Sequence, residues 1–251
     1  LSKVIAVSGK DRGAILPAGK TGTAYMYMGS SGQFASSTYY MQEHPAWVNA
    51  FNAARPADRY FRSEWTALLP EAAYARSVAD NQPWFGPAGG GLPARFSAPE
   101  DTEPGPNFYG GLLRGPFGDA LTLDFARAAL AGEQLGQDNA PDILSISLSG
   151  HDYVNHAFSA ESRLSHDHVL QLDRLLQSFW HDLDAKVGKD QYVVVLTADH
   201  GFMPNVEYSA QQGQPSGRVD GAQALAHINA GLEAQFGPCL LYTSDAAGGE
   251  D

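Results

Sequence analysis

Two short runs of apolar residues most constrain how this chain can fold. Residues 143–148 and 192–196 have the length of strands and are rich in Ile, Val and Leu, which is typical of parallel strands that are covered on both faces. Between them, residues 161–186 carry apolar side chains at close to helical spacing. This pattern predicts the crossover helix of a βαβ unit. We therefore expect an α/β fold with a mostly parallel sheet.

Each of the two runs is followed by an aspartate and a histidine. Asp152 and His156 come after the first run, and Asp199 and His200 come after the second. Because ligands of open α/β sheets bind beyond the carboxyl ends of the strands, both pairs are predicted to lie at the same edge. Asp and His are zinc ligands, and four such groups left unpaired would be costly to desolvate. A metal cluster is the simplest compensation, whereas a single Asp/His pair could equally be a hydrogen-bonded cap.

Two cations follow the first predicted strand, at residues 3–7. If the chain stays extended there, Lys10 and Arg12 alternate along it and can point to the same side. They could bind an anion together, or they could simply be the solvated end of a strand.

Composition excludes several classes of protein. The chain has 251 residues, enough to bury one large core. Its net charge of −12 argues against a nucleic-acid scaffold held by a basic face. Its apolar runs are shorter than the roughly 20 residues of a membrane span. Cys239 is its single cysteine and forms no internal disulfide. The chain opens almost directly on a predicted strand, so we interpret its start as truncated. The lack of a visible signal peptide therefore says nothing about the cellular compartment.

The remaining elements are predicted from periodicity and turn residues. Residues 53–118 are rich in Pro and Gly, with weak periodicity, and are interpreted either as a functional insertion or lid or as a surface excursion without a catalytic role. Residues 239–251 resemble translated adapter or vector sequence and are excluded from the fold. Residues 1–238 are then one partial catalytic domain. Further predicted elements are two strands within 22–40, a helix starting near Pro45, and helices over 119–136 and 221–236.

Three motifs together resemble a known family. Thr197-Ala198-Asp199-His200-Gly201 matches the T-x-D-H-G signature of the alkaline phosphatase superfamily, and the segment from Asp152 to His156 matches its D-x-x-x-H signature. The segment from Ser8 to Arg12 is similar to the S-x-K-x-R segment of the phosphate-irrepressible-type alkaline phosphatases. That branch is related to the type I phosphodiesterases and nucleotide pyrophosphatases. The resemblance covers most of residues 1–236.

The resemblance implies a three-layer α/β/α sandwich that is incomplete at both ends, and two zinc ions. Asp152 and His156 would bind one zinc ion, and Asp199 and His200 the other. Lys10 and Arg12 would contact the nonbridging oxygens of a phosphoryl group, as catalytic and substrate-binding residues.

The implied activity is zinc-dependent hydrolysis of a small phosphate monoester through a phosphorylated Thr or Ser. That nucleophile, with a further aspartate ligand, is expected before Leu1, and a histidine ligand is expected past Pro238. The fragment itself is therefore expected to have little activity. Periplasmic or secreted localisation is implied by the resemblance, and no oligomeric state is predicted.

Three alternatives remain open at this point. A phosphodiesterase or nucleotide pyrophosphatase could use the same scaffold, and a sulfatase is disfavoured because no C/S-x-P-x-R motif is visible. A domain of another class could have kept the scaffold only to bind anions.

Other polar residues are given ordinary roles. His151 is expected on a loop surface, with support of the site as the alternative. His166 and His168 flank Asp167, which is expected on the polar face of the helix, so the H-D-H triplet is not assigned to a metal. Asn155 adds an amide near the site.

Overall fold

The computed structural model describes residues 1–86 and 90–237. The predicted adapter-like tail, residues 239–251, and three residues of the predicted insertion, 87–89, lie outside the described residues. The chain separates into two compact units, Leu1–Pro204 and Asn205–Asp251, and each is described by itself.

The first unit is built on a four-stranded sheet. Its strands are β1 (Val4–Ser8), β2 (Thr23–Met28), β3 (Gln33–Ala35) and β6 (Ile143–Ser147), in the order β3-β2-β1-β6. β1 runs parallel to both β2 and β6, and only β3 is antiparallel. The central strand β1 is almost entirely buried, as expected for a parallel strand with layers on both faces. The predicted parallel sheet is confirmed.

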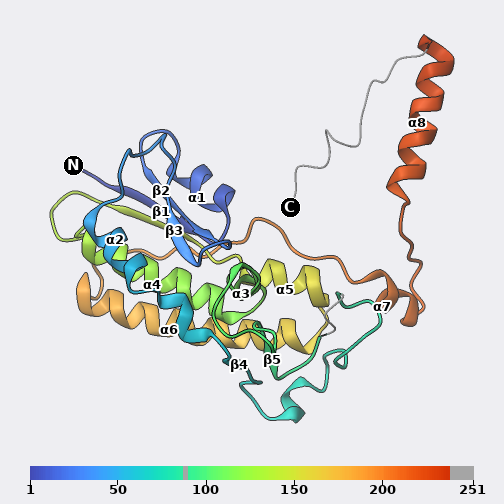
Figure 1. Ribbon diagram of the computed structural model, residues 1–251, viewed down its shortest axis with the longest axis horizontal. Coiled ribbons are helices and arrows are strands. Elements are labelled where there is room, and N and C mark those ends of the chain that lie inside the picture. Colours follow the sequence, from blue (N-terminus) through green and yellow to red (C-terminus); the bar gives the residue numbers. More distant parts are fainter. Residues whose placement is uncertain (87–89, 238–251) are drawn as a thin grey trace. The chain divides into compact units, whose positions relative to one another are not determined.

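Helices cover both faces of this sheet (Figure 1). α1 (Asp11–Ala18) packs on one face, against β1 and β2, and α4 (Pro116–Gly132) packs on the other. α6 (Arg163–Lys186) lies beside α4 and brings Phe179 into a cluster with side chains of β6. The predicted three-layer α/β/α arrangement is therefore confirmed. The helix predicted over residues 161–186 forms as α6, but no second parallel strand follows it among the described residues, so the predicted βαβ unit is not complete.

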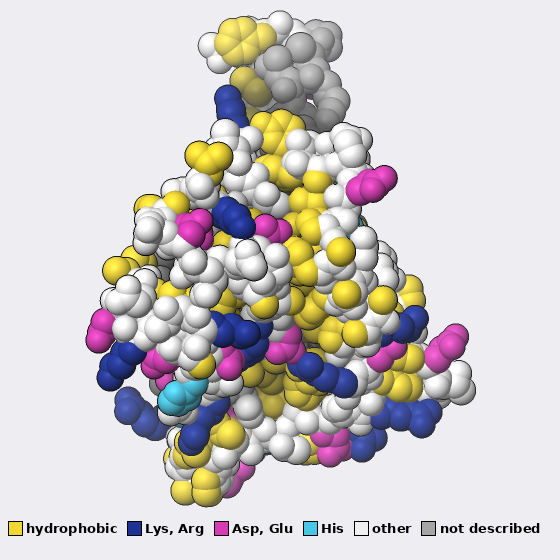
Figure 2. Space-filling view, turned by 90° about the vertical axis from the view of Figure 1, so that its left-hand side faces the viewer, with side chains coloured by type: hydrophobic (Ala, Val, Ile, Leu, Met, Phe, Trp, Pro, Cys, Tyr) yellow, Lys and Arg dark blue, Asp and Glu magenta, His cyan; other side chains and the backbone are white. Residues whose placement is uncertain are grey.

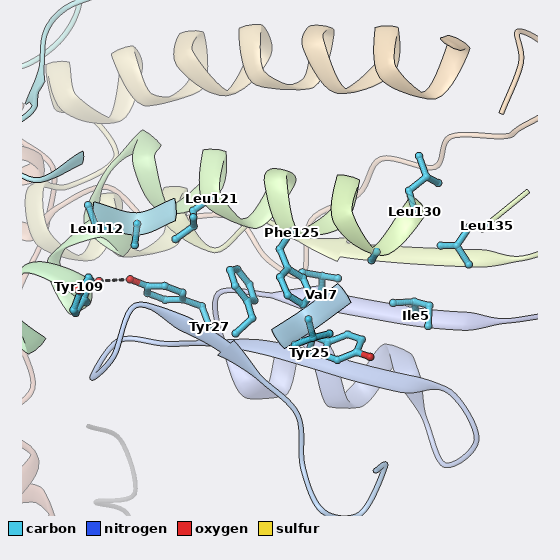
Figure 3. Close-up of a cluster of buried hydrophobic side chains, with 14 of the residues drawn as sticks. Ile5, Val7, Tyr25, Tyr27, Tyr109, Leu112, Leu121, Phe125, Leu130 and Leu135 are labelled. Carbon is cyan, nitrogen blue, oxygen red and sulfur yellow. Dashed lines mark hydrogen bonds between the residues drawn. The ribbon is translucent and has the colours of Figure 1, made fainter. Parts of the chain in front are cut away.

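Aromatic side chains fill the space between the sheet and α4 (Figure 3). The rings of Phe34 and Phe125 are stacked, with centroids 4.1 Å apart, and Tyr25 meets Phe125 at 5.3 Å. The hydroxyl of Tyr27 donates to the Tyr109 carbonyl at 3.0 Å. Because α4 is covered by the sheet on one side and by α6 on the other, it is apolar around much of its circumference.

The other predicted helices also form, with local caps that explain where they begin. Pro45 is the N-cap residue of α2 (Ala46–Ala53), and Ser162 caps α6 by accepting a hydrogen bond from Ser165 N. α4 ends at Gly132 instead of Gly136, because the chain turns through Gln134 at a positive φ of 54°. Outside residues 53–118, the structure also has α5 (Gly150–Phe158) in the first unit, and α7 (Val206–Gln211) and α8 (Gly221–Phe236) in the second.

The predicted insertion is irregular but firmly attached to α6. One attachment is Asp167, which accepts hydrogen bonds from Trp65 Nε1 at 2.5 Å, Leu68 N at 2.7 Å and Tyr74 OH at 2.5 Å. The prediction that Asp167 lies on a polar helix face is wrong, because the insertion covers it completely. The short elements here are η1 (Pro56–Tyr60), β4 (Glu64–Trp65), η2 (Glu71–Tyr74), β5 (Ala94–Arg95), α3 (Pro106–Gly111) and η3 (Leu112–Arg114).

The second predicted strand, residues 192–196, does not form. Val193 is 90% exposed and Leu196 is 75% exposed, and β6 is the edge strand of the sheet in the described part of the chain. A strand needs a hydrogen-bonded neighbour and an apolar cover for its face. No described strand pairs with residues 192–196, and no described element covers their apolar side chains. Apolar composition is therefore not sufficient to make this segment a strand.

Acidic and basic side chains are mixed at the surface. On the face drawn in Figure 2, Lys and Arg side chains lie beside Asp and Glu side chains. Among the ion pairs of the first unit is that of Arg127 with Asp182, at 2.5 Å. In the described part of the chain, no helix combines the length and the apolar character that a membrane crossing requires.

Candidate functional site

The carboxyl ends of β1 and β6 bring together residues that are far apart in the sequence. Lys10 is the N-cap residue of α1, just after β1, and Asp152 lies in the first turn of α5, just after β6. The Lys10 ammonium forms an ion pair with the Asp152 carboxylate. Because β1 and β6 are adjacent and parallel, both residues leave the sheet at the same edge.

A glycine lets α1 begin close to this edge. A Cβ atom at Gly13 would lie 2.4 Å from Ser8 Oγ and 2.6 Å from Ser147 Oγ, at the ends of β1 and β6. Only a residue without a side chain fits so near two strand ends. Ser8 Oγ also accepts a hydrogen bond from Lys10 N at 2.9 Å, so the turn between β1 and α1 holds Lys10 in place.

Asp152 is the centre of the site. Its Oδ1 atom lies 3.4 Å from His156 Nε2 and 3.6 Å from His200 Nε2, while Lys10 binds Oδ2. Burial raises the pKa of Asp152, but the hydrogen bond and charge of Lys10, together with the two imidazoles, outweigh burial and hold that pKa below its ordinary value. Asp152 is therefore an anion at neutral pH, the state in which a carboxylate binds cations.

The D-x-x-x-H motif lies on a helix. Asp152 and His156 are four residues apart within α5, and this spacing places two side chains on the same face of a helix. The helix therefore explains why the motif needs this spacing.

The other predicted site residues differ in their distance from Asp152. His200 reaches it, whereas the Asp199 side chain is 90% exposed, with Oδ2 lying 3.6 Å from His200 Nε2. The prediction that Arg12 alternates with Lys10 on an extended segment is wrong, because α1 begins at Asp11. Lys10 is the extended N-cap residue and Arg12 lies within the first turn of α1, so the two side chains do not alternate along one extended strand. The Arg12 side chain is exposed and forms no ion pair with any described residue.

The donor types at Asp152 fit a divalent cation. Asp152 Oδ1 is buried and accepts no hydrogen bond from any described residue, although two imidazole nitrogens face it. An unpaired buried carboxylate oxygen is unfavourable, and a cation bound by carboxylate and imidazole would satisfy it. The ligands are not pre-assembled, however: within residues 1–86 and 90–237, no group of three His, Cys, Asp or Glu side chains is arranged to hold a metal ion.

Sequence reasoning missed a buried polar cluster behind this site. His168 is completely buried, and its Nε2 atom lies 3.2 Å from Oδ2 of the buried Asp119. His151, expected on a loop surface, lies in α5 and is partly buried, and burial lowers its pKa, with the nearby His168 adding to this effect. A signal was available, because Leu164, His168 and Leu172 recur every four residues, which places His168 on the apolar stripe of α6.

A cavity of about 690 Å³ opens beside His200. His151 and His200 line it from the site, and Arg76 and Ser77 line it from the predicted insertion. The insertion is held there by a contact of 3.1 Å between Ser77 Oγ and His166 Nδ1. Residues 53–118 thus form part of the wall next to the candidate site.

The fold and the motifs are those of the alkaline phosphatase superfamily. Within it, the chain belongs to the type I phosphodiesterase / nucleotide pyrophosphatase family, which matches residues 3–216.

The curated relatives include alkaline phosphatases and a protein of Myroides odoratus named calcium-transporting ATPase, which is 37% identical over 97% of this chain and 45% of that protein. The chain is 42% identical to alkaline phosphatase PhoV of Synechococcus elongatus over 219 residues, which is 87% of this chain and 40% of PhoV. It is 39% identical to alkaline phosphatase PafA of Elizabethkingia meningoseptica over 94% of this chain and 43% of PafA. The crystal structure of wild-type PafA superposes with a TM-score of 0.81 at 38% identity, covering 94% of this chain and 45% of that one. The chain therefore spans about two fifths of the length of these relatives.

Proposed function

We propose that the protein to which this chain belongs hydrolyses phosphate monoesters with the help of bound zinc ions. One observation carries the proposal: Lys10, His156 and His200 converge on the carboxylate of Asp152. A cation and nitrogen ligands around one carboxylate are the parts that phosphoryl transfer needs, since it depends mainly on positioning and charge neutralisation. The alkaline phosphatase names of the relatives support the same activity.

Each residue has a proposed role. Asp152 and His156 hold one zinc ion, and Asp199 and His200 hold a second. Two such ions would supply charge for the attacking and leaving oxygens of the displacement. Lys10 is held at the same edge by β1 and α1, so its compact charge can neutralise a nonbridging oxygen of the substrate. Arg12 is proposed to bind the phosphoryl group as well, which requires its exposed side chain to turn toward Lys10.

We place residues 1–238 in one catalytic domain, with 53–118 as an insertion that borders the site. The nucleophilic Thr or Ser and a further aspartate ligand are proposed to lie in coding sequence before Leu1, and a further histidine ligand after Pro238. The whole protein is proposed to act in the periplasm or outside the cell. The resemblance to alkaline phosphatases is the support for these three statements.

A phosphodiesterase or nucleotide pyrophosphatase is the second candidate, because the matching family bears that description. A monoester dianion carries more charge than a diester. The pair of cations proposed for the phosphoryl group, Lys10 and Arg12, therefore favours monoesters.

The test uses the protein expressed from the full coding sequence. Zinc content is measured, together with turnover of p-nitrophenyl phosphate and of bis(p-nitrophenyl) phosphate at alkaline pH. We expect bound zinc, preference for the monoester, and a larger loss on the monoester in Lys10→Ala. Preference for the diester would select the second candidate. A metal-free protein without turnover would rule out both, and phosphate binding by that protein would indicate an anion-binding domain.

A further inference from the structure

A buried carboxylate and imidazole lie directly behind the start of α5. Asp119 comes from α4 and is 1% exposed, and His168 comes from α6 and is fully buried. Asp119 Oδ2 and His168 Nε2 are 3.2 Å apart. Neither residue belongs to the proposed metal or phosphate ligands. Their pairing joins the two helices that cover one face of the sheet.

The same carboxylate holds the backbone of α5. Asp119 Oδ1 accepts a hydrogen bond of 3.0 Å from the backbone N–H of Gly150, the first residue of α5. Ser149, the N-cap residue of α5, provides no side-chain cap. Asp119, a residue of α4, therefore caps the N-terminus of α5. The dipole of α5 also favours a negative charge at this end.

The backbone of α5 passes very close to this pair. A Cβ atom at Gly150 would lie 2.7 Å from Asp119 Oδ2 and 3.0 Å from His168 Nε2. Only glycine permits this approach. Asp152 follows two residues later, within the same helical turn, so any shift of Gly150 moves the Asp152 carboxylate as well.

The pair is a costly way to cap a helix. Asp119 Oδ2 and both ring nitrogens of His168 have no partner of hydrogen-bond geometry among the described residues, and neither has Nδ1 of His151. The His151 and His168 rings lie 5.4 Å apart. Burying polar atoms without hydrogen-bond partners is unfavourable, whereas a Ser or Asp side chain at the N-cap would satisfy the same N–H without burying a charge. Capping of α5 alone therefore does not explain why Asp119 and His168 are buried here. The pair also fixes the position of the turn that carries Asp152.

We propose that Asp119 and His168 are positioning residues that place the Asp152 carboxylate toward Lys10, His156 and His200. The pair acts through the backbone of Gly150 and through packing against His151. The part that concerns metal binding rests on the proposed function. The placement of Asp152 against Lys10 is independent of it and can be measured on the metal-free chain.

The decisive experiment is a double-mutant cycle on the metal-free chain. Free energies of unfolding are measured for Lys10→Met, Asp152→Asn and the double variant, which gives the coupling between Lys10 and Asp152. The cycle is repeated in Asp119→Ala, Asp119→Asn and His168→Gln backgrounds. A residue that only stabilises the fold lowers every free energy equally and leaves the coupling unchanged.

We expect Asp119→Ala to reduce the coupling by at least half. Asp119→Asn should restore most of it, because the amide oxygen can still accept from Gly150 N. If Asp119→Ala does not fold, Gly150→Ala replaces it, since it displaces the turn without removing a charge and should give the same loss. A coupling that is the same in all of these backgrounds would overturn the proposal.

Cobalt binding separates this proposal from the proposed function. Co²⁺ is titrated into the protein expressed from the full coding sequence, as wild type and as Asp119→Ala, with affinity and the visible absorption spectrum as readouts. If the wild type binds Co²⁺, we expect at least tenfold weaker binding and an altered spectrum in Asp119→Ala, and an unaltered spectrum with unchanged affinity would count against positioning. If the wild type binds no Co²⁺ while the Lys10–Asp152 coupling still depends on Asp119, the positioning role stands and the metal assignment fails.

Discussion

Lys10 and Asp152 form an ion pair although 142 positions separate them in the sequence. The contact exists because β1 and β6 are neighbours in the sheet, with Ser8 paired in register with Ser147. Both side chains are mostly shielded from solvent, so their attraction is screened less by water and salt than that of a surface pair. Asp152 can in this way stay ionised inside the protein.

Metal affinity should depend unequally on the predicted ligands. We expect Asp152→Asn and His200→Ala to weaken zinc binding by at least tenfold in the protein from the full coding sequence, because these residues already face each other. Asp199→Ala should have an effect at least as large only if the exposed Asp199 turns inward on binding. Isothermal titration with Zn²⁺ measures each affinity. Asp173→Asn, on the exposed face of α6, is the matched control and should match the wild type.

Asp167 should be essential for the attachment of the predicted insertion. Asp167→Ala removes the acceptor of Trp65, Leu68 and Tyr74 and leaves buried donors unpaired, so we expect a loss of about 3 kcal/mol in the free energy of unfolding. Urea denaturation measures the loss, and limited proteolysis should show faster cleavage within 53–118. Asp173→Ala, on the same helix, should change neither. Wild-type proteolysis in the Asp167 variant would contradict the assignment.

Backbone hydrogen exchange should distinguish the two predicted strands. Amides of β1 and β6 bond to each other across the sheet and should exchange slowly. Amides of residues 193–196 belong to no strand and to an exposed segment, so they should exchange within seconds. Mass spectrometry of pulse-labelled peptides from this chain makes the comparison. Slow exchange over 193–196 would show that the segment forms a strand after all.

Stability should fall at strongly alkaline pH because of buried tyrosines. Burial raises the pKa of Tyr27, and the nearby Tyr109 and Asp58 raise it further. The native state then keeps a proton that the unfolded state loses above its ordinary pKa of 10.0. This contribution is complete below pH 10 and is lost as pH rises toward the native pKa, at about 1.4 kcal/mol per pH unit.

Tyr27→Phe tests this assignment. The substitution should cost about 1 kcal/mol at pH 8, since the hydrogen bond to Tyr109 is lost. Above pH 10 it should make the decline of stability shallower. Chemical denaturation between pH 8 and 11.5 measures both effects. Tyr39→Phe is the control, because Tyr39 is 65% exposed, and an equal change of slope in both variants would argue against burial as the cause.

Much of the fold could be predicted because its elements carry local signals. The Ile, Val and Ala side chains of β1, the helical spacing of α6 and the capping Ser162 are short-range patterns, and a short-range pattern specifies an element wherever the chain places it. Strand ends of a parallel sheet meet at one edge, which is why the two Asp/His pairs were expected to lie together. The proximity of Lys10 to Asp152 came from the pairing of β1 with β6. The three sequence motifs indicated the family.

The sequence alone determined the family, the mostly parallel sheet and the helices that carry a clear apolar period. Tertiary structure decided whether residues 192–196 form a strand and whether Asp167 and His168 are buried. Strand formation requires a partner, and the burial of a polar side chain depends on what other segments pack over it. Neither is encoded in neighbouring residues: the insertion supplies the donors that bury Asp167, and Asp119 of α4 supplies the charge beside His168. The spacing of apolar residues on α6 could indicate that His168 faces inward. That Asp119 lies beside it follows only from the packing of α4 against α6.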